Sequence, residues 1–203
     1  MHISEGVLSV PVLAGGAMLA AGAIAVGLKK LPDERIPQAG MLCAMFFVAS
    51  LIHLPVGVSA VHLVLNGLCG VLLGWAAFPV IAVALLLQAL LFGFGGLSVL
   101  GANIVVMGVP AVLCSCLFHA GFSTLTPHQA GLRGALAGGG AVALGIGLMT
   151  LALWLSSGTA YWPLIGTVLL AHLPVMAAEA AVTGAVVFLL ARTRPTLLAP
   201  ALT

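Results

Sequence analysis

The first two residues of the chain, Met1 and His2, can form a compact metal chelate. The terminal amine of Met1, the amide nitrogen of His2 and its imidazole Nδ1 can all reach one ion, because they close a five-membered and a six-membered ring. Three nitrogens in a plane leave a fourth position open, and an all-nitrogen planar set suits Ni(II) or Cu(II). The amine has to lose its proton, so metal binding should release protons.

One imidazole from elsewhere in the chain would complete this set, and His62 is the best candidate, with His53 as the alternative. Asn66 follows His62 by four residues, which predicts one helical turn on the same face and a role in orienting the ligand. Gln88 and Asn103 are further candidates for that role. For all three amides, a hydrogen bond between packed helices is the competing interpretation.

The elements that must position these residues cross a membrane. Apolar residues make up 63% of the 203-residue chain and charged residues only 5%, against roughly a quarter in a soluble domain. With so few charges the apolar residues have to face lipid as well as each other. The small net charge of +2 indicates no nucleic-acid partner.

Charges, prolines and polar clusters divide the chain into about seven transmembrane helices in a single domain covering residues 1–203. The predicted fold is therefore an all-α integral membrane protein. The first apolar segment is long enough to span a bilayer and lacks a preceding positive stretch, so we expect it to be retained rather than cleaved. The predicted helices cover residues 7–28, 38–53, 60–75, 79–94, 98–118, 133–155 and 163–190.

Basic residues favour the cytoplasmic side of a membrane, and this predicts the orientation. With the N-terminus outside, tucked into the bundle, and the C-terminus cytoplasmic, all six basic residues fall inside. This orientation places His2, His53 and the turn before His62 together at the outer face. The six basic residues are Lys29, Lys30, Arg35, Arg133, Arg192 and Arg194.

Glu179 is the only acidic residue well inside a predicted span, where a charge is expensive. His172 lies seven residues earlier on roughly the same helical face, so a structural pair of the two is the first interpretation. A part for Glu179 in coupling to another subunit is the alternative.

Several stretches resemble the cobalt/nickel substrate-binding (S) components of energy-coupling-factor (ECF) ABC transporters. The opening Met1-His2-Ile3-Ser4-Glu5-Gly6 looks like the N-terminal signature of that family, and residues 55–67 followed by 70–74 resemble its second histidine motif. Residues 84–103 and 172–184 are similar to its central and last helices. Some relatives carry further polar or histidine residues near positions 93–96, where this chain has Phe94, which cannot bind metal.

The resemblance implies a non-catalytic subunit that binds nickel or cobalt as substrate through Met1, His2 and His62, with no cofactor of its own. It also implies partners: a transmembrane coupling (T) subunit, two cytoplasmic ATPases and, in many systems, a small accessory membrane protein. A face of small residues on the first helix, Ala17, Ala21 and Ala25, would then contact the T subunit. The implied location is the cytoplasmic membrane of a bacterium or archaeon.

Two other functions compete with this one. Ser59 and His62 are three residues apart near a membrane face, and a serine–histidine pair could serve an intramembrane hydrolase. No acid follows to orient His62, and no strained nucleophile turn is evident. A stand-alone metal channel or carrier is the other alternative, although inverted halves and paired broken helices are missing from the sequence.

Overall fold

The computed structural model describes residues 2–51, 53–56, 59–119 and 125–198, without the side chains of residues 53–56, 59–61 and 164. Its seven α-helices in this part of the chain are α1 (Val10–Lys29), α2 (Ile36–Ala49), α3 (Asn66–Leu73), α4 (Ala77–Phe92), α5 (Leu100–His119), α6 (Pro127–Ser157) and α7 (Trp162–Thr193). Four 3-10 turns adjoin them at Asp33–Arg35, Gly74–Ala76, Gly158–Tyr161 and Pro195–Leu198.

Five helical stretches of the described residues are long and apolar enough to cross a membrane. They are Val10–Lys29, Asn66–Phe92, Leu100–His119, Pro127–Tyr161 and Ile165–Thr193. The 14 residues of α2 would extend only about 21 Å, against a hydrocarbon core of about 30 Å. The predicted multi-pass helical architecture is confirmed, whereas seven membrane crossings remain a prediction.

A β-hairpin lies where the sequence predicts the start of a helix. β1 (His53–Val56) pairs antiparallel with β2 (Ser59–His62), and His53 opposes His62 in the register. The predicted helix over 60–75 is therefore wrong in its first six residues, because α3 begins only at Asn66. Leu65 precedes it in the left-handed region, with φ of 56°, which is incompatible with a continuous helix from residue 60.

The short helix α3 is the centre of the bundle, and all eight of its residues are buried. Glycines allow its neighbours to approach closely. A Cβ at Gly70 would lie 2.0 Å from the carbonyl oxygen of Ala111 on α5, and one at Gly67 would lie 2.6 Å from that of Ala137 on α6. Small residues at such crossings permit the tight packing on which helix association in membranes depends.

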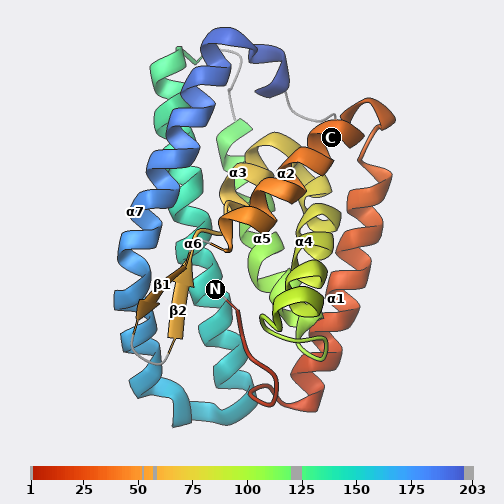
Figure 1. Cartoon of the computed structure of the whole chain (residues 1–203), viewed down its shortest axis with the longest axis vertical. Coiled ribbons are helices and arrows are strands. Elements are labelled where there is room, and N and C mark those ends of the chain that lie inside the picture. Colours follow the sequence, from red (N-terminus) through yellow and green to blue (C-terminus); the bar gives the residue numbers. More distant parts are fainter. Residues whose placement is uncertain (1, 52, 57–58, 120–124, 199–203) are drawn as a thin grey trace.

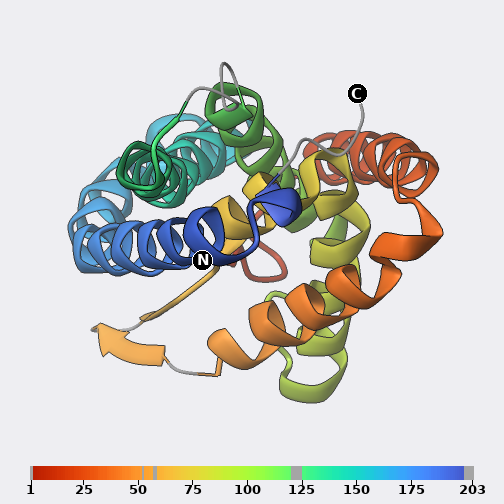
Figure 2. The same ribbon diagram turned by 90° about the horizontal axis from the view of Figure 1, so that it is seen from above.

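The longer helices surround this centre (Figures 1 and 2). α6 and α7 pack side by side and antiparallel, α5 lies between them and α4, and α1 packs on α5 and α4. α2 packs on α4 and crosses the bundle obliquely. The N-terminal tail, residues 2–9, has no regular structure and enters the space among these helices from the end at which α1 begins.

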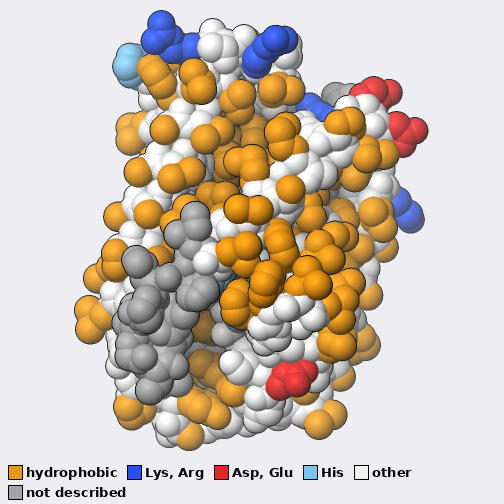
Figure 3. Space-filling model, viewed as in Figure 1, with side chains coloured by type: hydrophobic (Ala, Val, Ile, Leu, Met, Phe, Trp, Pro, Cys, Tyr) orange, Lys and Arg blue, Asp and Glu red, His pale blue; other side chains and the backbone are white. Residues whose placement is uncertain are grey.

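The face seen in Figure 3 is apolar over most of its coloured area, as lipid contact requires. Exposed large side chains include Val10, Met18, Leu117 and Leu170. The Lys and Arg side chains visible in Figure 3 lie toward the upper end of the molecule, where α1 and α7 end and α6 begins. One end of the bundle is thus basic, and the tail enters from the other.

Candidate metal-binding site

The N-terminal tail is held to the bundle by hydrogen bonds to its backbone. The side-chain amide of Asn103, on the first turn of α5, accepts from the Ile3 N–H at 2.9 Å and donates to the Ile3 carbonyl oxygen at 3.0 Å. The Glu5 N–H donates to the Gly95 carbonyl oxygen at 3.1 Å. One Glu5 carboxylate oxygen accepts from both the backbone N–H and the hydroxyl of Ser98, each at 3.0 Å.

A glycine-rich turn after α4 makes room for the tail. Gly95 has φ of +75°, and a Cβ there would lie 2.8 Å from the Asn103 Nδ2 atom. At Gly96, with φ of +117°, a Cβ would lie 2.2 Å from the side chain of Glu5. Both the conformation and the close approach therefore require glycine at this turn.

His62 ends β2 and begins a loop, residues 62–66, that leads into α3; we call it the His62 loop. The carboxylate of Glu179 on α7 holds this loop. Its Oε1 atom accepts hydrogen bonds from the backbone N–H groups of Val64 and, at 2.8 Å, of Leu65. Glu179 thereby holds the two residues that directly precede α3.

The two histidines meet inside the bundle, and their neighbours determine which nitrogen of each ring is protonated. The His2 Nε2 atom lies 2.7 Å from Oε1 of Gln88, and the His62 Nδ1 atom lies 2.8 Å from the Leu63 carbonyl oxygen. Both oxygens can only accept, so each of these nitrogens carries its hydrogen. The remaining ring nitrogens, Nδ1 of His2 and Nε2 of His62, consequently present lone pairs.

These two lone-pair nitrogens face one another at 3.0 Å. At this distance the pair forms a hydrogen bond if one ring carries a second proton, whereas two neutral rings with lone pairs can instead share a cation. With metal–nitrogen bonds of about 2.0 Å, adjacent ligands of a square plane lie about 2.8 Å apart and opposite ligands about 4 Å apart. The observed separation fits two adjacent ligands of one ion.

The surroundings keep His2 in the neutral form that binds metal. Burial, followed by the proximity of positive charge, lowers the pKa of His2 to about 2. The ring of Phe94 contributes to the enclosure, with its centroid 6.1 Å from that of the imidazole. Phe94 thus forms an apolar wall beside His2.

The predicted orienting amides divide into two groups. Gln88 contacts His2, and Asn103 holds Ile3, the residue after it. The Asn66 side chain instead donates to the Met107 carbonyl oxygen on α5 at 3.2 Å and accepts from the Gly67 N–H, so it links helices. Because residue 62 is in a strand, Asn66 is not one helical turn below His62, and that expectation is wrong.

Other predicted residues lie partly or wholly outside the description. Met1 is not among the described residues, nor are the side chains of His53 and Ser59. Among the described residues, no three His, Cys, Asp or Glu side chains gather where they could hold a metal. The described part of the chain therefore supplies two imidazoles, and any further ligand has to come from elsewhere.

Glu179 and His172 do not form the expected structural pair. The His172 Nδ1 atom lies 2.7 Å from the Val168 carbonyl oxygen, and its buried Nε2 atom has no hydrogen-bond partner in the described structure. Glu179 bonds to the His62 loop instead. Its position as a lone acid inside a span was the sequence signal of a special role, but its partners are distant in sequence.

The contacts of Leu63, Glu5 and Gly95 are not evident from the sequence alone. Leu63 acts through its carbonyl oxygen, which leaves no side-chain signature. Glu5 and Gly95 belong to stretches that carry the family resemblance, and their backbone pairing is a signal only once the tail is known to enter the bundle.

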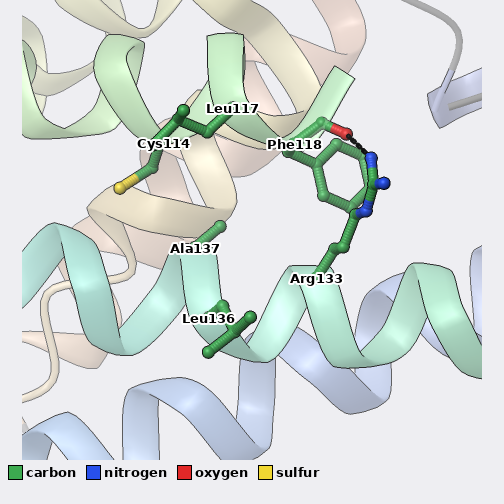
Figure 4. A pocket seen from close by; sticks show the side chains of 6 residues that line it. All are labelled: Cys114, Leu117, Phe118, Arg133, Leu136 and Ala137. Atoms are coloured by element: carbon green, nitrogen blue, oxygen red, sulfur yellow. Dashed lines mark hydrogen bonds between the residues drawn. The ribbon is translucent and has the colours of Figure 1, made fainter. Parts of the chain in front are cut away.

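Two cavities in the described structure lie away from the histidines. One of 270 Å³ between α5 and α6 contains Arg133, whose guanidinium donates to the Phe118 carbonyl oxygen at 3.4 Å (Figure 4). The other, of 430 Å³, is an apolar groove beside α1, with Leu19, Trp75 and Leu113 among its lining residues. Neither is lined by His2 or His62, so the histidine pair is the stronger candidate for metal binding.

Comparisons with known proteins find relatives that are named as metal transport proteins. A family model described as the cobalt uptake substrate-specific transmembrane region, CbiM, matches residues 2–197. A protein of Haemophilus influenzae named as a metal transport protein is 45% identical over 199 residues, covering 96% of this chain and 95% of that protein. The cobalt transport protein CbiM of Geobacter sulfurreducens is 35% identical over 216 residues, covering 98% of this chain and 62% of that protein.

A nickel transport protein and two solved structures are also similar to this chain. The fused nickel transport protein NikMN of Rhodobacter capsulatus is 36% identical over 127 residues, covering 59% of this chain and 36% of that protein. A crystal structure of a transition metal transporter matches with a TM-score of 0.79 at 25% identity, covering 95% of this chain and 93% of that one. A truncated transition metal transporter matches with a TM-score of 0.74 at 26% identity, covering 95% and 99%.

Proposed function

Because the chain belongs to the CbiM family of cobalt uptake substrate-specific transmembrane regions, we propose that it is the metal-binding S component of an ECF-type ABC transporter importing nickel or cobalt. The observation that carries this proposal is the pair of lone-pair nitrogens, His2 Nδ1 and His62 Nε2, facing each other at 3.0 Å inside the bundle. A divalent transition metal supplies the positive charge that this pair needs.

The proposed ligands are the amine that Met1 carries as first residue, the amide nitrogen and Nδ1 of His2, and Nε2 of His62. In a planar chelate of the first three nitrogens, the amide is central and the open position lies next to Nδ1. Filling that position with His62 requires adjacent ligands, and their expected spacing of about 2.8 Å agrees with the observed 3.0 Å. The alternative fourth ligand, His53, lacks such support.

The donor set favours Ni(II), because four nitrogens in a plane suit that ion, while Co(II) is the other substrate that the family membership supports. The outward-facing entrance is the end from which the tail enters, and the basic end faces the cytoplasm. The chain hydrolyses nothing itself. A T subunit and two ATPases, with an accessory membrane subunit where required, would drive release of the ion inward across the cytoplasmic membrane.

The hydrolase alternative is not favoured by the positions of the described atoms. A catalytic base needs one ring nitrogen directed at its nucleophile. Both ring nitrogens of His62 are already directed elsewhere, Nδ1 at the Leu63 carbonyl oxygen and Nε2 at His2.

Calorimetry with Ni(II) and Co(II) tests the ligand set. The intact protein should bind one equivalent, and His62→Ala or one extra residue before Met1 should reduce the affinity at least about 100-fold, since each removes a ligand from the ion. Lys30→Gln, at the basic end, serves as a control for handling and folding. Tight binding by the extended form would exclude the terminal amine as a ligand.

Uptake into vesicles tests the coupling. Vesicles that hold this chain alone should accumulate no Ni(II), whereas vesicles that also hold a T subunit and its ATPases should do so when ATP is supplied. Accumulation by the chain alone would instead favour the stand-alone carrier.

A further inference from the structure

Glu179 is the only acidic residue of the described structure that is buried. Asp33, Glu34 and Glu5 are exposed at the ends of the bundle or on the tail, whereas Glu179 has an exposure of 0% in the middle of α7. A lone acid at such a depth is expensive to insert and is a functional candidate on that ground.

The two oxygens of Glu179 have different surroundings. Oε1 accepts the N–H groups of Val64 and Leu65, while Oε2 is buried without a hydrogen-bond partner among the described residues. A glutamine could accept the same two hydrogen bonds through its own Oε1 atom, at a much lower desolvation penalty. Hydrogen bonding to the loop therefore does not explain why this position holds an acid.

The proposed metal site lies close to this carboxylate. The Val64 nitrogen follows His62 by only two residues, which limits its distance from the His62 Cα atom to about 7 Å. A divalent ion bound through a deprotonated amide leaves one positive charge, and a single carboxylate balances it. A nearby cation in turn favours the ionised form of the carboxyl group.

We propose that Glu179 is the counter-charge of the bound metal ion. Its carboxylate is hydrogen-bonded to the His62 loop and stabilises the bound ion electrostatically without ligating it. This inference rests on the proposed function. Glu179 is a positioning residue in that it touches the loop and not the metal. At a separation of about 10 Å and an effective dielectric constant of about 20, the attraction corresponds to roughly tenfold in the binding constant.

Two conservative variants separate charge from shape. Glu179→Gln keeps the two hydrogen bonds and loses the charge, whereas Glu179→Asp keeps the charge and weakens the bonds through its shorter side chain. If Glu179 is the counter-charge, calorimetry with Ni(II) should show a loss of roughly tenfold for Glu179→Gln and a smaller loss for Glu179→Asp. The visible absorption spectrum of the Ni(II)-bound site should be the same in both, because the ligands are unchanged.

A purely structural role predicts the opposite order, with Glu179→Gln binding as the wild type does and Glu179→Asp impaired. Either that order, or a changed Ni(II) spectrum in Glu179→Gln, would overturn the proposal. Glu34→Gln removes an exposed acid from the distant basic end and is the matched control; it should bind like the wild type.

If Glu179→Gln also disturbs folding, a second variant that places a carboxylate at a neighbouring position still tests the proposal. Thr183 lies one turn further along α7, is buried, and has a hydroxyl without a hydrogen-bond partner in the described structure. Adding Thr183→Asp to Glu179→Gln should restore part of the affinity if charge is what the site needs, and no recovery would count against it. If instead the wild type and Glu34→Gln fail to bind one equivalent of Ni(II), the proposed function itself is wrong.

Discussion

The two halves of the candidate site are held in opposite ways. The N-terminal tail is fixed by several contacts to the α4–α5 region: Asn103 and Gly95 hold its backbone, and Ser98 holds the solvent-exposed carboxylate of Glu5. The His62 loop is held on the α7 side by one buried carboxylate, that of Glu179.

The difference indicates how each half contributes to the site. Several separate contacts hold the tail, so losing one of them should weaken its docking only in part. The loop depends on a single buried acid, whose charge acts on its surroundings through the low dielectric of the interior. The tail therefore should respond to sterics and hydrogen bonding, and the loop to charge.

The largest effect on the tail should come from a side chain placed in the space that the tail occupies beside Gly95. Gly95→Val places a Cβ against Asn103 Nδ2, which lies 2.8 Å away, and expels the tail, so Ni(II) affinity should fall roughly 100-fold or more. Gly93→Val is the matched control: its φ of +68° imposes a similar backbone strain, but no atom lies within 4 Å of its Cβ. Equal losses in the two variants, measured by calorimetry, would show that strain and not the tail is responsible.

Removing the Asn103 side chain should have the next largest effect. Asn103→Ala leaves the buried N–H and carbonyl of Ile3 unpaired, which costs about 2–4 kcal/mol and weakens Ni(II) binding roughly 30-fold or more. Asn103→Asp still accepts from the N–H but cannot donate to the carbonyl, so its affinity should be intermediate. Hydrogen exchange at the Ile3 amide should be faster in Asn103→Asp than in the wild type and fastest in Asn103→Ala. An unchanged exchange rate would show that Asn103 does not hold Ile3 in place.

Gln88 tests the protonation pattern of the pair itself. Gln88→Leu removes the acceptor that holds the hydrogen of His2 on Nε2, and the loss of such a partner reduces metal affinity about 10-fold or somewhat more. Gln88→Glu retains an acceptor and adds a negative charge beside His2, so it should bind at least as tightly as the wild type. If Gln88→Leu binds Ni(II) as tightly as the wild type, the lone pair on Nδ1 does not depend on Gln88.

The smallest effect concerns the exposed end of the tail. The backbone N–H of Ser98, and then its hydroxyl, lower the pKa of Glu5 below its usual value of 4.5. A carboxylate whose folded pKa is lowered stabilises the docked tail above about pH 4.5, and this contribution disappears as the pH falls through the lowered pKa. Hydrogen exchange of the backbone amide of residue 5 should therefore be slower in the wild type than in Glu5→Gln near neutral pH. The two rates should become equal in acid. If the difference between the two proteins became larger in acid, the ionised form of Glu5 would not be the one that stabilises the docked tail.

The membrane class, the approximate helices and the chemistry of Met1, His2 and His62 follow from residue types. An apolar fraction of 63% leaves no other environment, and an imidazole at position two chelates by covalent geometry alone. The hairpin was not predicted: its two strands pair with each other, and Leu65 in the left-handed region separates them from α3.

What the sequence by itself determined is therefore compositional and local: an apolar helical protein, six basic residues that favour one orientation, and a histidine at position two whose donor atoms could chelate a metal. Only the tertiary structure decided that the imidazoles of His2 and His62 meet at 3.0 Å, with Gln88 and Leu63 setting their protonation. It also decided that Glu179 serves the His62 loop rather than His172. The physical reason is that the contacts of His2 with His62 and Gln88, and of Glu179 with the His62 loop, join residues 60 to 115 positions apart, where side-chain periodicity carries no information about partners.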